Sequence, residues 1–184
     1  MTINELQKKW GSVAVAGRFH RASICSFLLF SLFTFSCSSI DCPVENTVAV
    51  RYGIFSTDGV DEVADTLQDT LWVWTRRLDG SDTLILNRGI GLTSFSLYVS
   101  YQRPADTLIF LIADTSRVRT LDTVIVSKED IPHFESVDCN AHFFHRLTSV
   151  ASTHQGIDTV FINQPTVNYD QTATHLHIHF KARR

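Results

Sequence analysis

Residues 92–101 alternate between apolar and polar side chains, and this period of two constrains the fold more than any other feature of the chain. Phe95, Leu97, Val99 and Tyr101 would share one face, opposite Ser94, Ser96, Tyr98 and Ser100. Successive side chains of a strand point to opposite faces, so the pattern predicts a half-buried strand. No stretch after Cys42 has the spacing of an amphipathic helix.

Eight further segments are typical of strands separated by turn-forming residues. They are 47–55, 71–75, 83–86, 107–113, 120–126, 142–150, 157–162 and 175–180. Six Asp-Thr pairs precede an aliphatic residue, beginning at Asp65, Asp69, Asp82, Asp106, Asp122 and Asp158. Asp favours turns and Thr favours strands, so these pairs should mark strand starts. Many short strands without helices predict an antiparallel two-layer β-sandwich, immunoglobulin-like in layout, over residues 47–184.

An uncharged run rich in Leu and Phe spans residues 24–36. Basic residues precede it at Lys8, Lys9, Arg18 and Arg21. The run is shorter than the ~20 residues that a spanning helix needs. A basic stretch, an apolar run and then small residues are the layout of a secretory signal, so residues 1–36 are interpreted as an export segment.

Cys37 follows this run directly after the small residue Ser36. A cysteine at this point is where bacterial lipoproteins are cleaved and acylated, and several acyl chains hold a protein stably on a membrane. We therefore expect residues 37–46 to be a lipidated tether of an outer-membrane lipoprotein facing the periplasm or the cell surface. The alternative is an ordinary signal peptide, with Cys37 merely near the cleavage site.

The export segment determines the chemical environment of the other cysteines. Cys25 lies in the export segment, which leaves Cys42 and Cys139 in an oxidising compartment. They are far apart and form no Cys-x-x-Cys motif, so zinc-ribbon and thioredoxin chemistry are disfavoured. We predict a Cys42–Cys139 disulfide; the alternative is a free buried thiol.

The charge pattern argues against nucleic-acid binding. Four of the 16 basic residues and one of the 19 acidic residues precede Cys37, so the rest carries 12 against 18, a net charge of −6. Nucleic-acid binding requires a basic footprint, which this part of the chain lacks.

Several motifs resemble those of an uncharacterised family of Bacteroidetes cell-envelope lipoproteins. They are Cys37-Ser-Ser-Ile-Asp-Cys-Pro43, the repeated Asp-Thr-Leu, Asp138-Cys139 followed by Phe144-His-Arg-Leu147, and Ile162-Asn-Gln-Pro-Thr-Val-Asn-Tyr-Asp170. The resemblance covers the chain from Cys37 onward. It implies an envelope location and a β-rich domain, and it supplies no catalytic residues.

The last predicted strand places His175, His177 and His179 on one face. A His-x-His pair on a strand binds zinc or copper if a third ligand converges, for which His142, His145 and Asp170 are candidates. The alternative is a solvated polar face opposite the apolar Leu176, Ile178 and Phe180.

Trp72 and Trp74 share a predicted strand face with Arg76. Adjacent exposed indoles form a flat platform that stacks on sugars or recruits a partner protein. The alternative is a strand covered on both sides, since large aromatic side chains usually supply core area.

Two other signals are weak. Asp58, Asp61, Glu62, Asp65 and Asp69 supply oxygen ligands without the spacing of a known calcium loop, so a solvated acidic loop is the simpler interpretation. The sequence has no Gly-x-Ser-x-Gly, Ser-x-x-Lys or His-Glu-x-x-His motif. We therefore expect a non-catalytic binding or structural domain of the envelope without a cofactor, with an envelope protein or a glycan as partner. The alternatives are a carbohydrate-binding module at Trp72 and Trp74, and a metal-binding protein at the C-terminal histidines.

Overall fold

The part of the chain that the structure describes is built from β-strands. The computed structural model describes residues 48–116, 118–136, 139 and 142–182, and within these ranges no residue is helical. The strands are β1 (Val50–Thr57), β2 (Glu62–Ala64), β3 (Thr70–Arg76), β4 (Asp82–Gly89), β5 (Ser94–Leu97), β6 (Ala105–Ala113), β7 (Arg119–His133), β8 (His142–Ser152), β9 (Ile157–Ile162), β10 (Thr166–Val167) and β11 (Leu176–Phe180). They all belong to one structural unit, Cys42–Arg184.

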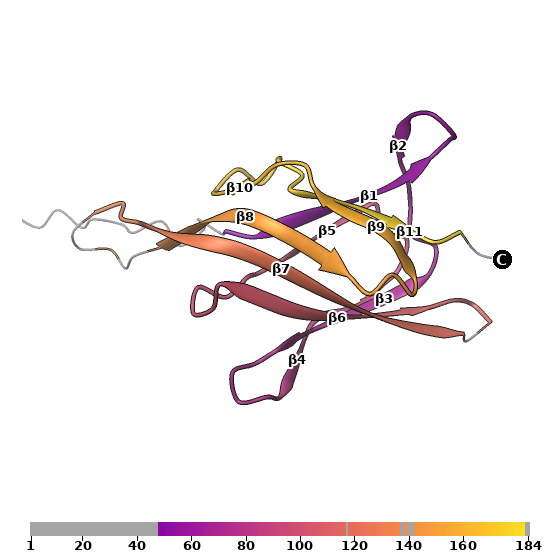
Figure 1. Ribbon diagram of the computed structural model, residues 1–184, viewed down its shortest axis with the longest axis horizontal. Coiled ribbons are helices and arrows are strands. Elements are labelled where there is room, and N and C mark those ends of the chain that lie inside the picture. Colours follow the sequence, from indigo (N-terminus) through magenta and orange to yellow (C-terminus); the bar gives the residue numbers. More distant parts are fainter. Residues whose placement is uncertain (1–47, 117, 137–138, 140–141, 183–184) are drawn as a thin grey trace, which may run out of the picture. The chain divides into compact units, whose positions relative to one another are not determined.

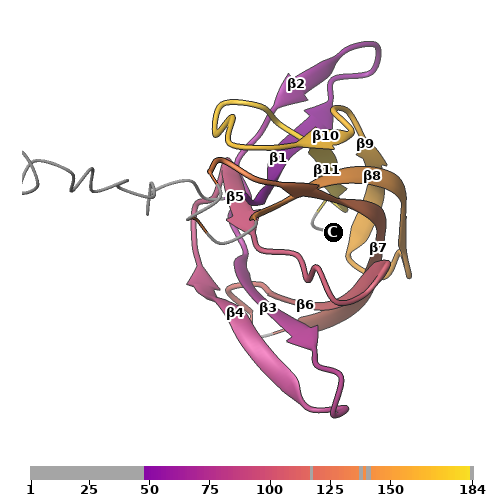
Figure 2. The same cartoon turned by 90° about the vertical axis from the view of Figure 1, so that its left-hand side faces the viewer.

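Two sheets form the layers of a sandwich (Figure 1). The larger has the order β10-β8-β7-β6-β3-β4, and all of its pairs are antiparallel. The smaller has the order β2-β1-β11-β9, with β5 also paired to β1. Seen end-on, the larger sheet curves around the smaller one (Figure 2). The predicted all-β two-layer sandwich is confirmed.

One strand pair departs from the antiparallel expectation. β1 and β11 run parallel, with Tyr52 opposite Leu176 and Phe55 opposite His179. Parallel neighbours require a long connection between them, and here that connection is nearly the whole domain. The first and last strands of the domain therefore lie side by side.

The core lies between the inner faces of the two sheets. Tyr52 and Phe95 stack with their ring centroids 4.8 Å apart, and Phe110 of the larger sheet lies 6.2 Å and 6.1 Å from them. Leu71, Val73, Leu108, Val124, Val126, Ile157, Leu176 and Ile178 surround this group and are fully buried. Each such side chain contributes ~1.5–3 kcal/mol through its removal from water.

The β7–β8 hairpin extends past the strand beside it. Pairing of β6 with β7 stops at Ala105 and Ser127, whereas β7 and β8 stay paired as far as His133 and His142. The two-residue strand β10 covers part of the extension by pairing with Arg146 and His145.

Candidate functional sites

The outer face of the six-stranded sheet carries apolar side chains at positions where a solvated sheet would carry polar ones. Three cross-strand rows make up this face: Trp72–Leu111–Leu121, Leu84–Trp74–Ile109–Thr123 and Thr107–Ile125–Ala151. Directly opposed side chains on one face lie ~4.5–5.5 Å apart at Cβ, so the rows form one continuous surface. We call this uncharged surface the outer patch.

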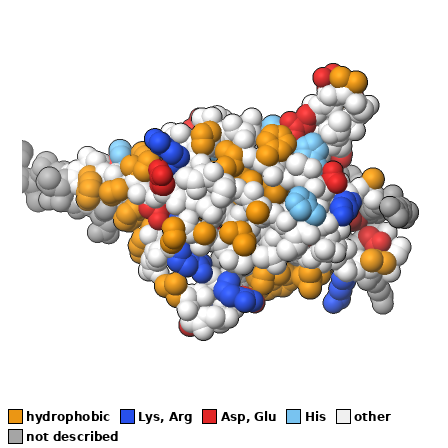
Figure 3. Space-filling model, viewed as in Figure 1, with side chains coloured by type: hydrophobic (Ala, Val, Ile, Leu, Met, Phe, Trp, Pro, Cys, Tyr) orange, Lys and Arg blue, Asp and Glu red, His pale blue; other side chains and the backbone are white. Residues whose placement is uncertain are grey.

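The outer patch is open to solvent. Leu121 is 59% exposed, Ile125 43% and Leu84 41%. A space-filling view shows hydrophobic side chains spread over β6 and β7 with few charges among them (Figure 3). Soluble monomers rarely expose large contiguous apolar areas, and those that do usually bind a partner there.

Trp72 and Trp74 lie on this patch, and both are partly buried. Their indoles are therefore neither a fully exposed platform nor part of the core. Arg76 lies at the edge of the patch and pairs with Asp82 through two contacts, 2.8 Å from Nε to Oδ1 and 3.1 Å from Nη2 to Oδ2. The hydrogen bond from Arg76 lowers the pKa of Asp82.

His177 and His179 lie together on the outer face of the smaller sheet. One carboxylate bridges them: Glu62 Oε2 is 2.8 Å from Nδ1 of His177, and Oε1 is 2.7 Å from Nε2 of His179. Burial alone would raise the pKa of Glu62, but the hydrogen bonds from the two imidazoles outweigh it, so the pKa is lowered. The ring of Phe55 stacks on His177 at 4.0 Å and covers one side of this group.

His175 does not share that face. It precedes β11, is 1% exposed, and its Nδ1 accepts the backbone N–H of Arg51 at 3.0 Å. The backbone N–H of His175 donates to the backbone carbonyl of Arg51 at 2.9 Å. Burial lowers the pKa of His175 and so favours the neutral ring, which is the form whose Nδ1 can accept the Arg51 hydrogen bond. The side chain therefore ties the start of the parallel β1–β11 pair together.

The proposed third metal ligands do not converge on His177 and His179. His145 bonds Asp130, Asp170 accepts hydrogen bonds from Thr172, and His142 packs edge-on against Tyr169. Among the described residues, no three His, Cys, Asp or Glu side chains are arranged to hold a metal ion.

The acidic segment that precedes β3 makes contacts with its own backbone and with two histidines of β11. Asp58 Oδ1 accepts the backbone N–H of Asp61 at 3.2 Å, Asp65 Oδ1 accepts that of Thr66 at 2.7 Å, and Glu62 bridges the two histidines. The segment therefore forms a turn and the short strand β2, whereas the interpretation from the sequence is a solvated acidic loop.

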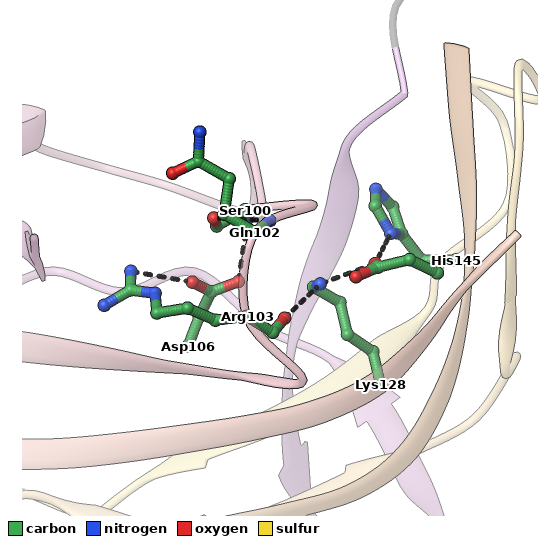
Figure 4. A network of polar contacts seen from close by, with 7 residues as sticks. Ser100, Gln102, Arg103, Asp106, Lys128 and His145 are labelled. Carbon is green, nitrogen blue, oxygen red and sulfur yellow. Dashed lines mark hydrogen bonds and ion pairs between the residues drawn. The ribbon is translucent and has the colours of Figure 1, made fainter. Parts of the chain in front are cut away.

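A buried polar network, which sequence reasoning missed, lies at the base of the β7–β8 extension (Figure 4). Lys128 Nζ donates to Asp130 Oδ1 at 2.6 Å and to the carbonyl of Arg103 at 2.9 Å. His145 Nδ1 contacts the same Asp130 oxygen at 2.6 Å. Desolvation lowers the pKa of His145, against the opposing effect of Asp130, so burial favours the neutral ring.

The network continues to Asp106, which is 2% exposed. Its Oδ1 accepts from Arg103 Nη2 at 3.0 Å, and its Oδ2 accepts the backbone N–H of Ser100 at 2.8 Å. Asp106 belongs to one of the Asp-Thr pairs, and Lys128 and Asp130 are two residues apart in the sequence. The spacing of Lys128 and Asp130 indicates that they share one face of a strand. Because both residues are charged, the sequence suggests that this face is solvated, and the buried network could not be predicted.

Cys139 lies near the tip of the hairpin and is disulfide-bonded. Its predicted partner, Cys42, and the predicted lipidation site, Cys37, lie outside the described residues. In the described part of the chain, no helix is long and apolar enough to cross a membrane.

These observations define a two-layer β-sandwich domain whose larger sheet presents an apolar outer face. The model of a family of unknown function, DUF6452, matches residues 70–180. The chain belongs to this family. No curated protein and no solved structure matches the chain.

Proposed function

We propose that this protein is a lipid-anchored, non-catalytic component of the bacterial cell envelope whose sandwich binds a partner protein through the outer patch. The apolar run 24–36, ending at Cys37, supports the anchor, as does the resemblance to Bacteroidetes envelope lipoproteins. The observation that carries the binding role is the solvent exposure of the uncharged outer patch, with Leu121 59% exposed.

The chemistry of the outer patch favours a protein over a small ligand. Its exposed large side chains are the aliphatic Leu84 of β4 and Leu121 and Ile125 of β7, and the partly buried members on β3 and β6 lie between them. Such a surface lacks the convergent polar groups of a small-molecule site. It matches the apolar centre of a protein interface, where charged residues are depleted.

The anchor is tested by fractionation. Cells that produce the wild-type protein should hold it in the membrane fraction with an acyl-shifted mass, and a Cys37→Ala variant should lose both properties. Unchanged fractionation and mass in the variant would contradict the anchor.

The binding role is tested by site-specific photo-crosslinking in intact cells. A photoreactive residue at Leu121 should give a discrete adduct, and one at Val118, an equally exposed position on the β6–β7 turn, should give none. The adduct should disappear when Ile125→Asp is added. Equal labelling from both positions, or an adduct that survives Ile125→Asp, would count against the outer patch.

The pair of indoles supports carbohydrate binding as a second candidate. Trp72 and Trp74 lie on the same partly exposed face beside the polar Arg76–Asp82 pair, and sugars bind where aromatic rings adjoin hydrogen-bonding groups. Titration with envelope glycans should shift tryptophan emission in the wild-type protein and not in Trp72→Ala/Trp74→Ala. A glycan panel without effect on emission would exclude this candidate.

A further inference from the structure

We call the end of the sandwich at which the described chain enters β1, through residues 48–50, the proximal end. β1 begins there, and Val50 pairs with Leu97, so the start of β1 lies beside Tyr98 at the end of β5. The tip of the β7–β8 hairpin points in the same direction as the start of β1 (Figure 1). The loop between β5 and β6 also lies at this end.

Aromatic contacts fix these segments to one another. The ring of Tyr101, in the β5–β6 loop, stacks on Phe143 of β8 with centroids 4.8 Å apart and planes 4° from parallel. Tyr169 packs edge-on against Phe144 at 4.9 Å. The proximal end is therefore a defined surface and not a set of independent loops.

Exposed aromatic side chains concentrate at the proximal end. Tyr98 is 71% exposed, Tyr101 57% and Phe134 68%. Four aromatic side chains in the described residues are exposed, and only Phe161 lies elsewhere. The aliphatic Ile131, 40% exposed, adds to the same surface.

We expect the disulfide at Cys139 to link this surface to the segment before β1. Cys139 is disulfide-bonded, and the other three cysteines of the sequence, Cys25, Cys37 and Cys42, all precede β1. With the predicted partner Cys42, four residues lie between the bond and Cys37, and the five residue steps span at most about 18 Å.

We propose that the proximal end docks on the surface of a lipid bilayer, with Tyr98, Tyr101 and Phe134 at the level of the headgroups. This proposal rests on the proposed lipid anchor at Cys37, because the anchor determines which end faces the membrane. Tyr and other amphipathic rings favour the membrane–water interface. The chain from Cys37 onward carries a net charge of −6, so docking depends on the aromatic rings and not on attraction to anionic lipids.

The test uses the mature, acylated protein, purified from membranes and returned to phosphatidylcholine vesicles that contain brominated lipid. Phe134→Trp reports on the proximal end, and Val118→Trp, at the β6–β7 turn of the opposite end, is the matched control. Each is compared with the parent protein, which supplies the background from the native tryptophans. Tyr98→Trp is a second reporter at an equally exposed position. Vesicle flotation is measured on the same samples.

We expect all of these proteins to float with the vesicles. After subtraction of the parent's signal, the quenching of tryptophan fluorescence should be at least threefold greater for Phe134→Trp than for Val118→Trp, at both 50 mM and 500 mM salt. Flotation with equal quenching from both ends would overturn docking and leave the anchor intact. If the emission of Phe134→Trp shifts with protein concentration in the absence of lipid, a second copy of the protein covers the proximal end. This result would also overturn docking on the bilayer. Absence of flotation would overturn the anchor, and the docking proposal with it.

Discussion

Lys128 and Asp130 form an ion pair inside the sandwich: Nζ lies 2.6 Å from Oδ1, and the lysine side chain is 0% exposed. The two residues are neighbours on the inner face of β7, so one strand supplies both charges. The carbonyl of Arg103 accepts a second hydrogen bond from Nζ. This contact joins the β5–β6 loop to the base of the hairpin and holds the charged group where water cannot reach it.

Removal of the lysine charge should destabilise the domain. Breaking a buried pair from one side leaves an uncompensated charge, so Lys128→Met should lower the free energy of unfolding by ~3–5 kcal/mol. Lys128→Met/Asp130→Leu should recover part of this loss, because no buried charge then lacks its partner. Urea unfolding followed by tryptophan fluorescence measures both values. A loss below ~1 kcal/mol in the single variant would contradict the role of the pair.

Asp122 should make stability depend on acid pH. It is 1% exposed, and its carboxylate accepts the backbone N–H groups of Gln155, Gly156 and Ile157 and the hydroxyl of Thr153. Burial alone would raise its pKa, but these bonds outweigh burial, so the pKa is lowered. A carboxyl group with a lowered pKa in the folded state stabilises the fold at pH values above its unfolded pKa of about 3.9. This stabilisation is lost as the pH falls through the folded pKa.

Asp122→Asn should therefore lose ~1.5–3 kcal/mol of unfolding free energy at pH 7, since it removes charged hydrogen bonds. The difference from wild type should shrink below about pH 4. Asp158→Asn, in the exposed Asp-Thr pair of β9, is the control and should change little. A difference that stays constant from pH 7 to pH 2 would refute the charged-acceptor role. Thermal unfolding across this pH range is the measurement.

Tyr52→Phe should leave stability unchanged or raise it by up to ~2 kcal/mol. The Tyr52 hydroxyl is buried, and no described residue bonds it. A buried polar group without a partner costs free energy, which the phenylalanine avoids. Burial, with a contribution from Asp106, raises the pKa of Tyr52, so wild-type stability should also fall above about pH 10, where the unfolded tyrosine ionises. A clear loss of stability in Tyr52→Phe, with Tyr98→Phe as the neutral control, would show that the hydroxyl has a partner.

Loss of the disulfide should weaken the domain without unfolding it at 25 °C. Cys139→Ser should cost ~2–4 kcal/mol, a typical value for one disulfide. Peptide mapping without reduction should identify Cys42 as the partner, and Cys42→Ser should then cost the same amount as Cys139→Ser. Unequal losses would point to a different partner.

The period-two pattern was sufficient for the sandwich but not for every strand. Each of the nine predicted strands has a counterpart, and Asp-Thr pairs do mark the starts of β3, β4, β6 and β9. β2 and β10 were missed because two or three residues carry no detectable period and are strands only through their partners. β5 stops at Leu97, although the alternation continues to Tyr101, because the chain turns away at the proximal end.

Residues 127–133 were not predicted as strand because Lys128, Glu129 and Asp130 look like solvated charges. Glu129 is indeed exposed, but Lys128 is buried and Asp130 partly buried, and their partners Arg103 and His145 are distant in the sequence. The same limit applies to Glu62, whose position between His177 and His179 requires knowledge of the sheet order. The local sequence pattern predicts which face of a strand a side chain occupies. Its contact partners on that face depend on how the strands pair in the folded domain.

The parallel pairing of β1 with β11 has a consequence for biosynthesis. A nascent chain that lacks residues 176–180 has no neighbour for the inner edge of its first strand or for β9. The smaller sheet can close only after residues 176–180 have been translated. Contacts between such distant positions also slow folding. An intermediate that lacks β11 should therefore remain open to proteases, and deletion of β11 alone should prevent maturation as effectively as a much longer C-terminal truncation.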